Sequence, residues 1–201
     1  MRASGSGPRR RRCERGAALV EAAIVLPLIM LVTFGAIEFG IGFTKKAGLE
    51  AIARSGARAG AAASADPNLA VDVANAVNAA LGSSSLPELE WMAVYRIPGD
   101  GSPPDESDNG GGPGCATNSS DFQDCAIFTF DNGKKEFDTS KYMGGWDNAP
   151  AVRVLCPSPT QPPDRIAVKI YGEFQYLTNM FGHGGVAMTS ESILQLEPNS
   201  C

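Results

Sequence analysis

The longest apolar run of the chain limits most strongly what it can fold into. Residues 22–37 carry no charge, and nine of these sixteen positions are Leu, Ile, Val or Phe. Residues 17–43 would form about 40 Å of α-helix, which is enough to cross a hydrocarbon core of about 30 Å. We therefore predict a transmembrane helix over residues 17–43. In a chain of 201 residues, this leaves room for one modest domain.

A basic leader precedes the apolar run. Residues 1–16 contain six arginines and one glutamate, and four of the arginines are consecutive at positions 9–12. Because basic residues mark the cytoplasmic side of a membrane span, we predict that the leader is cytoplasmic and that the rest is exported. The apolar run is longer than a secretory signal core, and no small-x-small cleavage pattern follows it before Lys45. We therefore expect the helix to remain attached as a single-pass anchor.

Glu21 is a carboxylate just inside this apolar helix. An ionised carboxylate near the middle of a bilayer costs about 3 kcal/mol, so membrane helices seldom carry one without a use for it. A plain anchor would insert more easily without Glu21. The residue is therefore predicted to have a function beyond anchoring.

The stretch after the span, residues 44–82, is predicted to be an extracytoplasmic helical region. Residues 44–65 are rich in alanine and can continue the first helix outward, and small residues such as Gly56 and Gly60 would permit close helix contact. Asp66 and Pro67 have the residue types of a helix N-cap and first helical position, and Gly82 is a typical helix stop. A second helix is expected between them.

Residues 83–201 are predicted to form an exported β-rich domain. From residue 88 the apolar pattern has period two, which places five side chains on one face of a strand: Leu89, Trp91, Ala93, Tyr95 and Ile97. Further strands are predicted at residues 126–130, 151–156, 165–177 and 186–196. No helical pattern separates them, so the sheet should be antiparallel. The expected fold class is α+β, with a long N-terminal transmembrane helix, a helical extension and a small antiparallel, pilin-like sheet domain.

The cysteines of the expected exported domain are even in number, which predicts two disulfides in an oxidising compartment. They are Cys115, Cys125, Cys156 and Cys201. Three connectivities are possible, and loop lengths favour Cys115–Cys125 and Cys156–Cys201. No Cys-x-x-Cys pair is present, and His183 is the only histidine of the chain, so no structural zinc site is predicted.

Residues 99–120 are rich in Gly, Pro, Ser and Asp and are predicted to form a disordered acidic loop. Four of its residues loosely match an EF-hand loop: Asp105, Ser107, Asn109 and Gly110. Ala116 occupies the position of the bidentate glutamate, which argues against calcium. No phosphate loop or nucleophile motif is present, so we predict no enzyme, metal or cofactor. Residues 17–201 contain 11 basic and 21 acidic residues, which argues against a nucleic-acid partner.

Several stretches resemble the TadE/TadG-like family of minor pilin-like proteins from the tight-adherence (Flp) pilus system of bacteria. The similar stretches are residues 15–21, the Ala-Ile-Val-Leu-Pro-Leu run that ends at residue 28, residues 34–40 and residues 51–58. Major Flp pilins carry an aromatic residue after the conserved glutamate. Here Ala22 follows Glu21, which favours a minor pilin.

This resemblance implies that a prepilin peptidase cleaves after Gly16, so that Ala17 becomes the N-terminus and Glu21 the fifth residue. An ammonium at Ala17 and the Glu21 carboxylate are both costly in an apolar setting, and pairing between subunits would remove part of that cost. The implied protein is a non-catalytic pseudopilin of the bacterial inner membrane. Its implied partners are other pilin and pseudopilin subunits, the pilus secretion machinery and membrane lipid.

A second class of function fits the same residues. The chain would then be an uncleaved, signal-anchored envelope or surface protein. Its exported domain would bind a ligand through the loop at residues 99–120.

Overall fold

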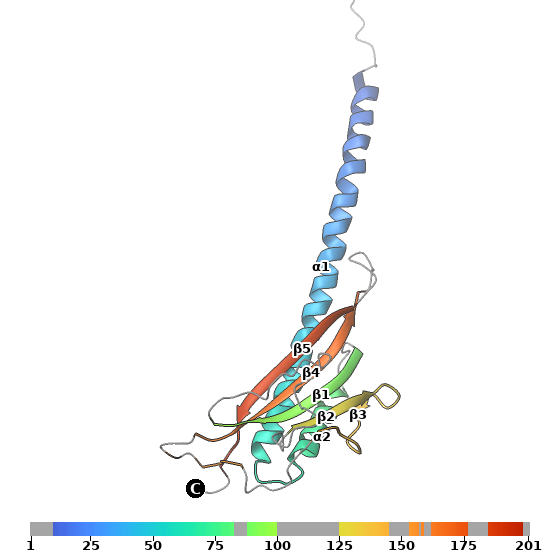
Figure 1. Cartoon of the computed structure of the whole chain (residues 1–201). Helices are drawn as coiled ribbons and strands as arrows, with labels where there is room; N and C mark the ends of the chain where they lie inside the picture. The colour runs from blue at the N-terminus through green and yellow to red at the C-terminus, as the bar shows by residue number, and fades with distance from the viewer. Residues whose placement is uncertain are drawn as a thin grey trace, which may run out of the picture. The chain divides into compact units, whose positions relative to one another are not determined.

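The computed structural model describes residues 10–82, 88–99, 125–144, 153–156, 158, 162–176 and 185–198. Its elements are α1 (Arg10–Ala62), α2 (Leu69–Leu81), β1 (Glu88–Ile97), β2 (Cys125–Asp131), β3 (Glu136–Phe137), β4 (Arg165–Gln175) and β5 (Gly185–Gln195) (Figure 1). The chain divides into a first unit, Met1–Gly42, and a second unit, Phe43–Cys201, and α1 contributes to both. The expected α+β fold, with a long apolar helix before an antiparallel sheet, is confirmed.

In the first unit, α1 is an apolar helix whose side chains from residue 16 to residue 34 are exposed. Pro27 lies inside the helix without ending it. A helix that is apolar on all sides is suited to lipid rather than water. By length and composition, Gly16–Ala62 is the one candidate membrane-spanning helix in the described part of the chain.

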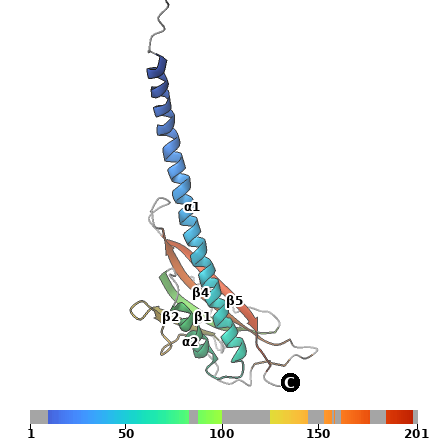
Figure 2. The same ribbon diagram turned by 180° about the vertical axis from the view of Figure 1, so that it is seen from behind.

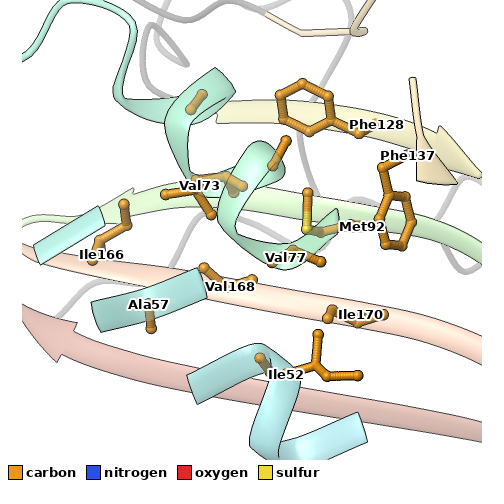
Figure 3. Close-up of a cluster of buried hydrophobic side chains, with 14 of the residues drawn as sticks. Ile52, Ala57, Val73, Val77, Met92, Phe128, Phe137, Ile166, Val168 and Ile170 are labelled. Carbon is orange, nitrogen blue, oxygen red and sulfur yellow. The ribbon is translucent and has the colours of Figure 1, made fainter. Parts of the chain in front are cut away.

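The second unit is a five-stranded antiparallel sheet of order β3-β2-β1-β4-β5, covered on one face by α2 and residues 43–62 of α1 (Figures 1 and 2). Apolar side chains from both helices meet those of the sheet in one buried core (Figure 3). Its members include Ile52, Ala57, Val73, Val77, Met92, Phe128, Phe137, Ile166, Val168 and Ile170.

The face that Leu89 occupies differs from the sequence prediction. Opposite β4, Leu89 pairs with Gly172 and Trp91 pairs with Tyr171, so Glu90 is an extra residue in a β-bulge. Because a bulge shifts the side-chain alternation by one residue, Leu89 joins the core beneath the helices instead of sharing a face with Trp91. The rest of the predicted alternation holds, since Ala93 lies in the separate cluster on the other face.

The strand predicted at residues 151–156 is wrong over its described part, because residues 153–156 are irregular. The Arg153 guanidinium donates hydrogen bonds to the Ser64 and Asp66 carbonyl oxygens at 2.8 and 2.9 Å. Val154 is hydrogen-bonded to Asp164 instead of to a strand of the sheet. The Asp164 amide donates to the Val154 carbonyl oxygen at 2.9 Å. The segment therefore ties the turn after α1 to the start of β4.

The short strand β3 was not predicted from the sequence. Asp131 begins the turn, and its Oδ1 accepts from the Gly133 amide at 2.8 Å. The outer edge of β3 is held by α2, because the Asn78 side chain donates to the Phe137 carbonyl at 3.0 Å and accepts from the Phe137 amide at 2.8 Å. Asn78 thus satisfies backbone groups that an edge strand would otherwise leave unpaired.

The second helix begins later than predicted, at Leu69. Asp66 still orders the chain ahead of it, since its Oδ1 accepts from the Asn68 amide at 2.7 Å. This contact belongs to a turn that precedes the helix, which explains why the N-cap prediction was two residues early.

Candidate functional site

The residues predicted for processing and for subunit assembly lie in the first unit. Gly16, Ala17 and Glu21 are all within α1, and all three are exposed. Ala17 and Glu21 are one helical turn apart and therefore lie on the same side of the helix. Among the described residues, no hydrogen bond or ion pair involves Glu21, and its neighbours Val20 and Ile24 are exposed apolar side chains.

Gly16 has no packing role in the described structure. A Cβ added at this position would meet nothing within 4 Å. Glycine inside a helix costs about 1 kcal/mol relative to alanine. A glycine that weakens the helix without making room for a neighbour is therefore consistent with recognition by another molecule.

A buried polar cluster of the second unit was not predicted from the sequence. Asp164 is 1% exposed, and its Oδ2 accepts from Arg96 Nη1 at 2.8 Å and from the Val154 amide at 2.9 Å. Its Oδ1 accepts from the Gly99 amide at 3.2 Å. These donors come from two separate segments, the end of β1 and residues 153–156, so the carboxylate holds both to the start of β4. This arrangement is structural, because the lone pairs of the carboxylate are used within the chain.

Two of the predicted disulfide cysteines are described. Cys125 is buried at the start of β2, Cys156 is exposed, and both are disulfide-bonded. Cys115 and Cys201 lie outside the described residues. The pairing Cys115–Cys125 and Cys156–Cys201 therefore stays a prediction.

Most of the predicted acidic loop at residues 99–120 also lies outside the described residues, as does His183. Among the residues that the structure describes, no group of three or more His, Cys, Asp or Glu side chains could hold a metal ion. The expected absence of metal, cofactor and catalysis stays a prediction.

Asp138 and Tyr171 are among the side chains of the second unit whose pKa values are displaced. Hydrogen bonds from the Ser140 hydroxyl and amide lower the pKa of Asp138, with the hydroxyl as the larger cause. Desolvation raises the pKa of Tyr171, and the nearby Glu90 and Glu173 carboxylates add to this shift. These groups do not converge on one site, so neither shift indicates an acid–base centre.

The described residues thus form one candidate membrane anchor and one α+β domain. Residues 16–58 match the family model of the TadE-like protein, which confirms the resemblance over this segment. The match includes Gly16, Ala17 and Glu21 and ends within α1, before the sheet. A TadE-like segment suggests a protein associated with Tad pili. No curated protein and no solved structure matches the chain.

Proposed function

We propose that this chain is a non-catalytic, minor pilin-like (pseudopilin) subunit of a bacterial tight-adherence (Flp) pilus assembly system. The first unit would anchor it in the inner membrane, with the leader in the cytoplasm and the second unit exported. One observation carries this proposal: the TadE-like match at residues 16–58 begins at Gly16 and covers an exposed apolar helix that contains Glu21.

The proposal assigns Gly16 and Ala17 to cleavage by a prepilin peptidase. Gly16 is exposed and makes no close contact that requires glycine, which supports a role in recognition by the peptidase. Cleavage would create an ammonium at Ala17. The Glu21 carboxylate, one turn away on the same side of α1, would then complement the ammonium of a neighbouring subunit.

The test is Glu21→Gln in the full chain, in cells that express the other pilus components. The substitution keeps the shape of the side chain and removes its charge, so membrane insertion should be unchanged or slightly easier. A buried ammonium in the assembly would lose its partner, at a cost of up to about 3–5 kcal/mol. Co-purification with other pilus subunits and surface adhesion should therefore be lost at normal membrane levels.

Glu50→Gln is the matched control. Glu50 also lies on α1, but it is partly exposed and faces Arg54 at 3.8 Å, an exposed pair worth less than about 1 kcal/mol. This variant should retain adhesion and partner recovery. Wild-type assembly by Glu21→Gln, together with an intact leader in the mass of the mature protein, would favour the alternative of an uncleaved envelope protein.

A further inference from the structure

The first charged residues after the predicted transmembrane segment, residues 17–43, contact one end of the sheet in the second unit. Lys45 Nζ lies 5.2 Å from the centroid of the Phe174 ring, and Lys46 Nζ donates a hydrogen bond to the Thr189 carbonyl oxygen. Phe174 pairs with Val186, one residue from the end of β4 and the start of β5. The second unit begins at Phe43, within α1. The first residues of α1 in this unit therefore lie at this end of the β4–β5 pair.

The contacts further along α1 fix its direction relative to β4. A Cβ added at Gly56 would lie 3.5 Å from Val168 Cγ1, and one added at Gly60 would lie 2.5 Å from Ile166 Cδ1. From residue 45 to residue 60, α1 rises about 22 Å. The residues of β4 that it meets run back from 174 to 166, about 26 Å of strand.

Within the second unit, α1 is thus antiparallel to β4. The last residues of β4 and the first of β5 lie beside Lys45, two residues after Phe43, at which the predicted span ends. This end of the sheet therefore contacts the residues of the second unit that directly follow the predicted span in the chain.

The residues at this end have the chemistry of a lipid–water interface. Phe43 is 78% exposed, and Val186 is 41% exposed. Lys45, Lys46 and Tyr176 are half-buried beside them. Aromatic side chains and lysines with apolar stems are typical of the headgroup level, and ammonium groups complement anionic lipid phosphates.

We propose that the β4–β5 end of the second unit, formed by Phe43, Lys45, Lys46, Tyr176 and Val186, binds the headgroups of the membrane that α1 enters. This inference rests on the membrane anchoring in the proposed function and adds a lipid-binding surface to the exported domain. The second unit then lies against the bilayer while the subunit is in the membrane.

The test is photocrosslinking of the full chain in vesicles of phosphatidylethanolamine and phosphatidylglycerol. Benzoylphenylalanine replaces Val186 in one variant and Ile193 in the matched control. Ile193 is 45% exposed and lies on the same strand, about 23 Å further along it. A third variant carries the label at Leu28, which is 64% exposed within the span and reports anchoring.

Mass spectrometry should find lipid adducts at residues 28 and 186, and several-fold fewer at residue 193. Adduct yields at residue 186 as low as those at residue 193, or adducts to a second copy of the chain there, would overturn the inference and leave anchoring intact. Absence of lipid adducts at residue 28 would overturn the anchoring as well. If the label at Val186 prevents folding, the adjacent exposed residue Ala187 takes its place with the same expected outcomes.

Discussion

Two glycines of α1 set how closely the helix lies to its neighbours. A Cβ at Gly56 would be 2.6 Å from Val77 Cγ2, and one at Gly60 would be 2.8 Å from Val73 Cγ2. Both distances are too short for real Cβ contacts, and valine side chains have little rotamer freedom with which to move away. The absence of a Cβ at these two glycines therefore lets α2 pack directly on α1.

We predict that Gly56→Ala destabilises the second unit by about 1 kcal/mol. Overpacking costs about 1–3 kcal/mol, and the better helix propensity of alanine returns up to about 1 kcal/mol. The measurement is denaturant unfolding of the full chain in detergent. In a Val77→Ala background the clash is absent, so the same change should become neutral or stabilising. An equal cost in both backgrounds would show that the Val77 contact does not set the requirement for glycine.

We predict that Ser140→Ala raises the pKa of Asp138 toward the ordinary value of an aspartate. The Ser140 hydroxyl donates to Asp138 Oδ1 at 2.6 Å and is the largest cause of the lowered pKa. The pKa of Asp138 in the folded chain is below its ordinary value. The hydrogen bond from Ser140 to the ionised carboxylate therefore stabilises the folded chain at pH values above the unfolded pKa of Asp138. It is lost as the pH falls through the folded pKa. An NMR titration of the Asp138 carboxyl carbon checks the shift, and an unchanged titration would remove the hydroxyl as its cause.

At the scale of elements, the polar cluster around Asp164 joins segments that are distant in the sequence. It connects Arg96 near the end of β1, Val154 in the irregular segment, and the start of β4. The Leu196 amide also donates to the Asp164 carbonyl at 3.0 Å, which adds the end of β5. Asp164 therefore fixes the corner of the sheet where β1 and β5 end and β4 begins.

We predict that Asp164→Ala destabilises the second unit by about 3–5 kcal/mol. The change removes the buried carboxylate that accepts from the Arg96 guanidinium and from two backbone amides. Thermal unfolding of the full chain in detergent is the measurement. Glu50→Gln is the control, because its partner Arg54 is 67% exposed and the pair should contribute less than about 1 kcal/mol. Equal effects of the two changes would contradict the structural role of Asp164.

The elements were predictable from the sequence where their signal is local. The period-two pattern predicted β1, and residues 126–130 lie within β2. The bulge at Glu90 and the irregular course of residues 153–156 were not predictable, because each depends on a partner far along the chain. Arg153, for example, is held by the carbonyl oxygens of Ser64 and Asp66.

At the scale of the whole molecule, the sequence predicted the apolar helix and the antiparallel sheet, and its resemblance to the TadE-like family is matched at residues 16–58. The candidate site was predictable because Gly16 and Glu21 stand out chemically within one helix. The end of the sheet that we propose to bind lipid was not, since it depends on Lys45 contacting Phe174, 129 positions later in the sequence. Long-range contacts of this kind have no local signature.

The orientation of the whole chain gives the last prediction. Residues 1–16 have a charge of +5, and only one apolar span follows them, so the second unit should be exported. The disulfide-bonded Cys125 and Cys156 agree with an oxidising compartment. A protease added outside spheroplasts should therefore digest the second unit and leave a fragment that carries the span. A tag on the leader should survive, with a cytoplasmic protein as the control for lysis. Protection of the second unit in intact spheroplasts, with digestion only after lysis, would reverse the orientation and exclude an exported pilin subunit.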